Sequence, residues 1–319
     1  MANSFISRNR RPISALGVLV VLLTAFTIAN PKVFLNIDLY TAVFTSLPLS
    51  LILAVPLVFV IAAGEIDLSF PSIVGVAAWA FAAVVGGGGS PVVGVLAALA
   101  AGALAGFVNG LLVTRAKLSS LVSTLGMNFL LRGLINLGTQ GQGIPLTAHL
   151  SDSTFRSVAA GEVGPIPAQM LWAIGFAVVG VLLFNYHRFG AQICCVGDNQ
   201  ESAREMGISV EGVRTKAFIY VGIAAAIVGV LSNSLNLIFW PNTGDGFLLS
   251  TLAAVFVGGT PTWGGVGTVT GAVIGTFTVG FVSTGIIAAG LTGFWTQFFY
   301  GMVIILSLLG HRFNQPRYR

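Results

Sequence analysis

Long apolar runs separated by short polar segments dominate the pattern of this 319-residue chain. A helix needs about 20 predominantly apolar residues to cross the hydrocarbon core of a bilayer. On this basis we predict ten membrane spans, at residues 13–29, 41–63, 70–86, 91–114, 119–138, 168–186, 214–239, 247–261, 266–289 and 292–310. The first run resembles a signal peptide, but no small-x-small cleavage site follows it, so we expect an uncleaved membrane helix. The predicted fold is an all-α polytopic membrane protein in which residues 1–319 form one domain.

The basic residues predict which ends of these spans face the cytoplasm, because cytoplasmic segments carry an excess of Lys and Arg. With the N-terminus inside, 12 of the 15 basic residues fall on the cytoplasmic side: Arg8, Arg10, Arg11, Arg115, Lys117, Arg188, Arg204, Arg214, Lys216, Arg312, Arg317 and Arg319. We therefore expect both termini and a loop at 187–216 to be cytoplasmic. Residues 139–167 would form the longest external loop, which either meets an extracytoplasmic partner or is a passive connector.

The loop at 187–216 is the one substantial hydrophilic segment. It holds eight of the charged residues of the chain, which has 15 basic and 10 acidic residues in all. It contains a candidate helix of about two turns. Asp198 or Asn199 can cap its start, Glu201 stands three residues after Asp198 as in a capping box, and Gly207 can end it in the left-handed conformation. A helix this short is not stable alone in water. We expect it to dock either onto the ends of its own membrane helices or onto a cytoplasmic partner.

Composition excludes several classes of protein. Hydrophobic residues make up 55% of the chain and charged residues 8%, against about 25% charged in a soluble domain. The mean hydropathy is +0.92. The net charge of +5 does not indicate nucleic-acid binding, because the basic residues are scattered at helix ends. The adjacent Cys194 and Cys195 are expected to be free thiols, and the three histidines are too far apart for a metal site. There is no GxxxxGK loop, so any ATP that drives the protein is bound by another chain.

Two apolar runs, 49–75 and 248–275, each break at a glycine-rich polar stretch and then resume. Paired interruptions at matching places in two halves indicate an internal pseudo-repeat and a transport path. Two turns in similar surroundings would also produce this likeness. The second break, GGTPTWGGVG (258–267), holds too many glycines for a regular helix. Its Trp263 is either an interface anchor or a gate residue.

The first break, GEIDLS (64–69), places Glu65, Asp67 and Ser69 within or next to the membrane. An ionised side chain at the bilayer centre costs roughly 2.5–3.5 kcal/mol on insertion scales, so such residues usually face a wet path or a partner. Asp67 or Ser69 alternatively caps the next helix. Glu65 has no such alternative and is the stronger candidate for lining a cavity.

Asn128 and Arg132 are four residues apart in LGMNFLLRG (125–133), so they share one helix face. An arginine at this position must face the bundle interior, face a cavity or reach an interface. Both a role in the substrate path and a structural tie to backbone carbonyls fit.

At these residues the chain resembles a known family. GEIDLS resembles the GGIDLS signature of the permease subunits of bacterial ABC importers of the ribose/xylose/arabinose/galactose type. The segment 197–231 resembles that family's cytoplasmic coupling segment, 258–275 its late glycine-rich motif, and 125–133 its LG-x-x-x-x-x-RG segment. The resemblance covers about residues 40–310 in the right order.

The resemblance implies a multi-pass protein of the bacterial cytoplasmic membrane that imports a small hydrophilic solute, such as a monosaccharide or polyol, by alternating access. A second permease copy, identical or paralogous, would pair with it, and an extracytoplasmic binding protein would deliver the solute. ATP and Mg²⁺ would bind to a separate cytoplasmic ATPase, and this chain would bind no cofactor or metal. The coupling helix that docks in the ATPase would comprise Gly197, Asp198, Asn199, Glu201, Ala203, Arg204, Glu205, Met206, Gly207 and Ile208.

Two departures from the family pattern bear on the solute and on coupling. Glu65 replaces the second glycine of GGIDLS, and a carboxylate beside the path is compatible with a polyol, an amine or a different sugar. Arg204 stands where the family often has an alanine. The alternative to an ABC permease is an ion-coupled secondary transporter, in which Glu65 and Asp67 would be the coupling carboxylates. A membrane enzyme would need a polar catalytic cluster, and the sequence contains none.

Overall fold

A computed structural model describes residues 10–151, 153–164 and 166–313, and this part of the chain is almost wholly helical. The long helices are α2 (Arg10–Ala29), α4 (Ile37–Ala62), α5 (Phe70–Gly86), α6 (Pro91–Thr114), α7 (Ser120–Thr139), α10 (Ala168–Asn185), α13 (Val210–Asn236), α15 (Val269–Ala288) and α16 (Phe294–Phe313). The shorter helices are α3 (Pro31–Phe34), α8 (Thr147–Leu150), α9 (Thr154–Ala160), α11 (Arg188–Asp198), α12 (Gln200–Glu205) and α14 (Phe247–Val257). Two antiparallel pairs of two-residue strands join β1 (Ile144–Pro145) to β4 (Ile238–Phe239) and β2 (Glu162–Val163) to β3 (Ile166–Pro167).

Each of the ten predicted spans contains one helix, and the all-α polytopic class is confirmed. Seven helices of the described chain are long and apolar enough to cross a membrane, and three further apolar helices, α5, α14 and α16, are shorter. Helix bounds differ from the prediction at several ends: the helix expected over 214–239 runs from Val210 to Asn236, and residues 238–239 form β4 instead. The helix predicted to reach residue 261 ends at Val257, because Gly258 and Gly259 follow it. Arg8, Arg317 and Arg319, which contribute to the predicted orientation, lie outside the described residues.

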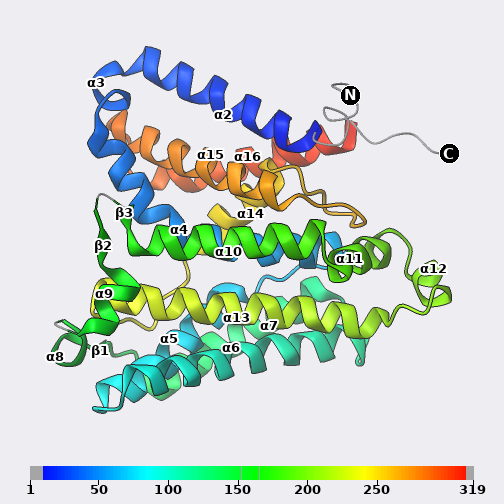
Figure 1. Cartoon of the computed structure of the whole chain (residues 1–319), viewed down its shortest axis with the longest axis horizontal. Coiled ribbons are helices and arrows are strands. Elements are labelled where there is room, and N and C mark those ends of the chain that lie inside the picture. The colour runs from blue at the N-terminus through cyan, green and yellow to red at the C-terminus, as the bar shows by residue number, and fades with distance from the viewer. Residues whose placement is uncertain (1–9, 152, 165, 314–319) are drawn as a thin grey trace.

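The helices run along the long axis of the molecule, and the loops gather at its two ends (Figure 1). At one end lie α11 and α12, together with the start of α2 and the end of α16. We call this the coupling end. At the opposite end lie α3, α8, α9 and strands β1 to β3, so residues 139–167 are on the far side of the bundle from 187–216.

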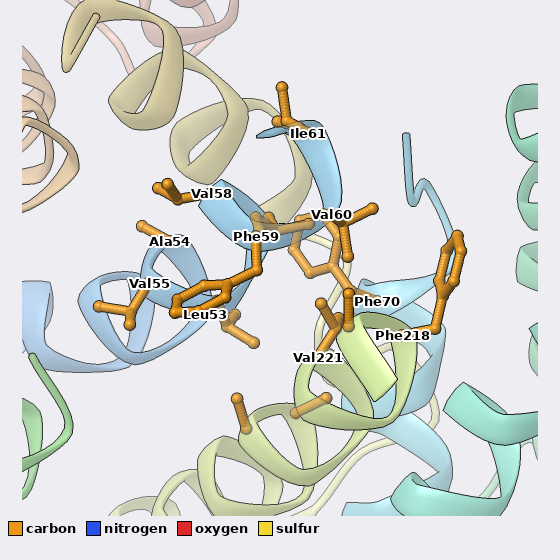
Figure 2. Close-up of a cluster of buried hydrophobic side chains, with 14 of the residues drawn as sticks. Leu53, Ala54, Val55, Val58, Phe59, Val60, Ile61, Phe70, Phe218 and Val221 are labelled. Carbon is orange, nitrogen blue, oxygen red and sulfur yellow. The ribbon is translucent and has the colours of Figure 1, made fainter. Parts of the chain in front are cut away.

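Helix α4 is the centre of the bundle, where it packs against α10, α13, α14 and α15. From Leu51 to Ala62 every residue is apolar and buried, as expected of a helix segment surrounded by other helices. Figure 2 shows Val60 of this helix beside Phe70 of α5, with Val221 of α13 close to Phe70. Two prolines, Pro48 and Pro56, lie inside this helix.

Phe59 ties α4 to three other helices. Its ring meets Phe184 of α10 and Tyr220 of α13 edge-on, with centroids 5.1 and 5.2 Å apart. It stacks on Phe189 of α11 at 5.7 Å. Aromatic contacts of this kind add roughly 0.5–1.5 kcal/mol each beyond the area they bury. The polar helix α11 is thereby anchored to the apolar core.

Small residues bring α6 and α13 into backbone contact. Gly102, Gly106 and Gly110 repeat every four residues along one face of α6. A Cβ added at Gly102 would lie 2.3 Å from the carbonyl oxygen of Gly222 on α13. This is the close packing through small residues that membrane helices use, since lipid gives no hydrophobic force between them.

Candidate coupling site and translocation path

Helix α12 is the short helix predicted in the polar loop, and both of its ends are capped. The Asn199 side chain accepts hydrogen bonds from the N–H groups of Glu201 and Ser202, at 2.9 and 3.1 Å. Asn199 is therefore the cap, and the capping box predicted from Asp198 is wrong because Asp198 is the last residue of α11. Gly197 likewise belongs to α11, which the sequence analysis did not identify as a separate helix.

The end of α12 has the left-handed glycine that the sequence predicts. Gly207 has a φ of +77°, and its N–H donates to the carbonyl of Arg204 at 2.9 Å. The N–H of Ile208 donates to the carbonyl of Ala203 at 3.0 Å. Together these bonds form a Schellman motif, which satisfies carbonyls that the helix leaves open.

Helix α12 has one docked side and one open side. Ala203 is fully buried and Ile208 is half-buried, whereas Glu201, Arg204, Glu205 and Met206 are exposed. Arg204 pairs with Glu211 of α13 at 2.6 Å. The helix thus rests on its own chain through Ala203 and presents an acidic surface with an exposed methionine outward.

Three glycines allow the backbone of the polar loop to pack directly against both breaks in the apolar runs. A Cβ on Gly197 would lie 1.9 Å from the carbonyl oxygen of Ala62 and 2.5 Å from the nitrogen of Gly265. A Cβ on Gly264 would lie 2.8 Å from the oxygen of Gly197 and 2.9 Å from the Cα of Gly64. We call Gly64, Gly197 and Gly264 the glycine junction. It joins three segments that are far apart in the sequence, and no side chain separates their backbones.

Glu65 lies beside the glycine junction and has a charge partner. Its carboxylate is 3.0 Å from the guanidinium of Arg214, and each side chain is only 11% exposed. Arg214 also donates to the side chain of Gln200 at 3.2 Å and to the carbonyl of Ala63 at 3.4 Å. The first break, the start of α12 and the start of α13 are thereby tied together by one arginine. From the sequence, Arg214 is predicted only to be one of the cytoplasmic basic residues, and its place in the charged loop is the one signal for a further role.

Asp67 and Ser69 form a buried network at the start of α5. Asp67 accepts hydrogen bonds from the backbone N–H and the hydroxyl of Ser69, at 2.7 and 2.6 Å. The amide of Asn109 on α6 donates to the Ser69 hydroxyl at 2.7 Å. All three side chains are fully buried. This is the geometry of the capping alternative, with Asp67 rather than Ser69 as the group that accepts from the helix N-terminus.

Asn128 and Arg132 point from one face of α7 to two different segments. The Ser72 hydroxyl of α5 donates to the Asn128 side chain at 2.7 Å. Arg132 donates to the carbonyls of Pro241 and Thr243, the latter at 3.2 Å, and forms an ion pair with Asp245. These bonds have the form of the structural tie considered from the sequence.

The partner of Arg132 is a segment for which the sequence predicted no role. Residues 240–246 (WPNTGDG) follow β4 and lead into α14, and they reach the first turns of α5. A Cβ added at Gly244 would lie 2.1 Å from the carbonyl oxygen of Pro71. The run of Pro, Gly and Asp between two apolar runs was the available signal. Such irregular backbone inside a membrane bundle needs protein or water around it, and here Arg132 supplies donors.

The predicted path residues therefore divide into two groups. Glu65, Asp67 and Ser69 lie near the coupling end, where the second break with the 42% exposed Trp263 also lies. Asn128 and Arg132 are farther along the bundle. Their role in translocation stays a prediction.

Burial raises the pKa of the Cys194 thiol in α11, where both cysteines are free and half-buried.

Comparison with known protein families matches residues 39–308 to the family described as "Branched-chain amino acid transport system / permease component". The chain belongs to this family. The permease is also similar to the Autoinducer 2 import system permease protein LsrC of several bacteria. The protein from Photorhabdus luminescens is 32% identical over 303 residues, which are 95% of this chain and 90% of the relative. The one from Yersinia enterocolitica is 32% identical over 304 residues, 94% of this chain and 82% of the relative.

A third such relative, from Enterobacter sp. (strain 638), is 33% identical over 296 residues, 92% of the permease and 84% of the relative. No solved structure matches the permease. These findings confirm a multi-pass permease subunit of a bacterial ABC importer in the cytoplasmic membrane, a class that works with an ATPase and a solute-binding protein. They give no support to the ion-coupled alternative.

Proposed function

We propose that this permease imports a small neutral hydrophilic solute, of the monosaccharide or polyol class, as one of two permease copies in an ATP-driven importer. The relatives named for autoinducer 2 import support this solute class. Ten apolar segments would cross the membrane; the shorter α5 and α16 would do so alone, whereas α14, with 11 residues, would do so together with the irregular segment 240–246 before it. The coupling end would then face the cytoplasm and residues 139–167 the outside, which the gathering of α11, α12, the start of α2 and the end of α16 at one end supports.

The observation that carries the proposal is that one side of α12 packs on the bundle while the other side is exposed. Its open acidic side is free to enter a groove on a cytoplasmic ATPase, while Ala203 and the glycine junction fix it to the bundle. ATP and Mg²⁺ bound to the ATPase would close its halves and displace α12. Because Gly197 contacts both breaks, that displacement passes to the α4–α5 and α14–α15 connections. The two permease copies then rock between inward-open and outward-open arrangements.

Co-purification tests this function. The permease is expressed with the proteins encoded beside it, extracted in mild detergent and assayed for a bound ATPase. We expect a stoichiometric ATPase, and the mass of the complex reports whether the second permease is identical. Glu205→Lys reverses an exposed charge of α12 and should lower ATPase recovery about tenfold, since charge complementarity governs such contacts.

The matched control is Glu162→Lys, which reverses an exposed charge at the opposite end of the molecule. It should recover as much ATPase as the unmodified chain. A permease that purifies without any ATPase would contradict the proposed function. Equal ATPase recovery by Glu205→Lys and Glu162→Lys would contradict the assignment of α12 as the docking helix.

A further inference from the structure

A polar cavity of about 480 Å³ lies between α4, α14, α15 and α16. Hydroxyl and amide groups from all four helices line it, among them Ser50, Ser250, Thr284, Thr296 and Gln297. Its volume falls in the range of about 300–1,000 Å³ that small-molecule sites occupy. Such sites are mostly apolar, with a few placed polar groups that orient the ligand. Hydroxyl and amide groups from four helices supply such polar groups here and favour a polar occupant.

A second cavity, of about 530 Å³, shows that this polarity is not general. It lies between α4, α10 and α15, and its lining is apolar apart from Thr270. Both cavities share the central helix α4. The α4 residues that line the second cavity, Phe44 and Leu51, are apolar, whereas Ser46 and Ser50 of α4 line the polar cavity.

The charge of the polar cavity restricts the class of solute. Among the described residues that line it, Asp245 is the one with a formal charge at neutral pH. Asp245 is ion-paired with Arg132, which does not line the cavity. A zwitterionic amino acid would need partners for both its ammonium and its carboxylate, and an anion would need a free cation. A neutral solute needs neither.

The hydrogen-bonding state of the lining favours a solute rich in hydroxyl groups. Ser250 and Thr284 each donate their hydroxyl hydrogen to a carbonyl of their own helix, Ser250 to Phe247 at 3.2 Å and Thr284 to Gly280 at 2.9 Å. Their oxygens keep lone pairs that can accept from a solute. The Gln297 amide can both donate and accept. Sugar and polyol hydroxyls offer both functions at once.

The cavity lies well away from the coupling end. Ser50 precedes Ala62, whose carbonyl contacts the glycine junction, by 12 residues of α4. At 1.5 Å per residue that is about 18 Å along the helix. Ser50 is near the middle of α4, so a solute held here would lie about midway along this helix, about 18 Å from the glycine junction.

We infer that this cavity is a binding site for a neutral polyhydroxylated solute, formed by the hydroxyl and amide side chains of α4, α14, α15 and α16. The inference rests on the proposed function and names the part of the chain that recognises its solute. Arg132 takes part indirectly, because its ion pair with Asp245 keeps the site neutral.

Cysteine protection tests the site directly in the full permease–ATPase complex. Cys194 and Cys195 are replaced by serine, and Ser50→Cys is introduced into this background. The rate of its alkylation by a small neutral maleimide is measured with D-ribose, ribitol or L-leucine added. We expect the two polyhydroxylated probes to slow alkylation about fivefold or more, because a bound solute would cover the Ser50→Cys thiol. L-leucine should have no effect.

Ile287→Cys is the control, since Ile287 is 61% exposed on α15 and does not line the cavity. Its alkylation should not respond to any probe. If Ser50→Cys does not assemble, Ser46→Cys, one turn earlier and more exposed, takes its place. Protection by L-leucine, or no protection by either polyhydroxylated probe, would overturn the inference.

Uptake of the same probes by proteoliposomes gives a second readout with a matched pair of substitutions. Thr284→Val removes a lining hydroxyl, whereas Thr278→Val removes one on the same helix that does not line the cavity. Both hydroxyls donate to the carbonyl four residues before them, at 2.9 Å. We expect Thr284→Val alone to raise the KM about fivefold, as loss of one hydrogen bond implies.

ATPase recovery from the same preparations separates the two proposals. Equal KM values for the two valine variants, with ATPase still bound and uptake intact, would contradict the cavity site and leave the proposed function standing. A permease without ATPase would contradict the proposed function, while protection of Ser50→Cys would still report on the cavity.

Discussion

The two breaks in the bundle occupy matching positions and share the glycine junction, but away from that junction they are held by different chemistry. In the first, between α4 and α5, side chains bind the irregular backbone: the Ser120 and Thr124 hydroxyls accept from the N–H groups of Ile66 and Leu68, at 3.1 and 3.0 Å. In the second, between α14 and α15, backbone packs directly on backbone. A Cβ on Gly258 would lie 2.5 Å from the nitrogen of Ala272.

This difference predicts which kind of substitution each break tolerates. The first break should be sensitive to the loss of a polar atom, because a buried N–H or carboxylate is then left unsatisfied. The second should be sensitive to the gain of a methyl group, because interiors are close-packed and backbone cannot move aside cheaply. The two breaks are therefore expected to respond to opposite kinds of substitution, one to the removal of a polar atom and the other to the addition of a methyl group.

The largest expected effect is steric and falls in the second break. Gly258→Ala should lower the free energy of unfolding by about 3 kcal/mol or more, because the new methyl group meets the backbone of α15. Gly258 has a φ of −61°, so backbone strain does not contribute. The measurement is the temperature at which detergent-extracted protein loses its monodisperse peak in size-exclusion chromatography.

Gly246→Ala is the control at the other end of the same helix. Gly246 has a similar φ of −71°, and a Cβ there meets nothing within 4 Å. This variant should match the unmodified protein within about 1 kcal/mol. Equal losses for both glycines would mean that close packing does not distinguish the second break.

The next effect is the loss of a charge partner in the first break. Arg214→Met leaves Glu65 mostly buried without a cation, which should cost about 3 kcal/mol. Adding Glu65→Gln to that variant should restore part of the loss, because the unpaired charge is removed. Thermal stability of the two single variants and the double variant gives the coupling energy.

Lys216→Met serves as the control for this series, since Lys216 is exposed on the same helix two residues later. It should change stability by less than about 0.5 kcal/mol. Strict additivity of Arg214→Met and Glu65→Gln would show that the two side chains do not interact.

The smallest expected effect tests the comparison through a hydrogen bond within the second break. Thr260 supplies a hydroxyl oxygen within the second break, which accepts from the N–H of Thr268 at 3.2 Å. Thr260→Val should cost about 1 kcal/mol, well below Gly258→Ala, because backbone packing rather than this bond holds the segment. Thr45→Val, at an exposed hydroxyl of α4, should have no measurable effect. A loss for Thr260→Val as large as that for Gly258→Ala would contradict the division between the two breaks.

Most of the secondary structure could be predicted because a membrane restricts it. Apolar runs must be helices in lipid, so the approximate position of each membrane helix follows from hydropathy. The cap of α12 could be narrowed to Asp198 or Asn199 but not decided, because the choice depends on where α11 ends. Helix α11 itself was missed, since its amphipathic 11 residues are too short and polar to register as a span.

The contacts of the site could not be predicted, because they join segments that the sequence separates widely. Glu65 and Arg214 are 149 positions apart, and nothing in either local pattern selects the other. The junction of Gly64, Gly197 and Gly264 depends on the path of three backbones. The segment 240–246 looked like an ordinary connection, and only its contact with Arg132 distinguishes it from one.

The prolines of α4 give the central helix a mechanical property. Proline has no N–H, so the carbonyls of Phe44 and Ile52, four residues before Pro48 and Pro56, lack their helical donor. Helices bend at such places. The part of α4 before Pro48 spans 11 residues, or about 17 Å, and forms one wall of the polar cavity. A bend of about 10° at Pro48 would displace the N-terminal end of α4 by about 3 Å, while the contacts of the glycine junction at its other end are kept.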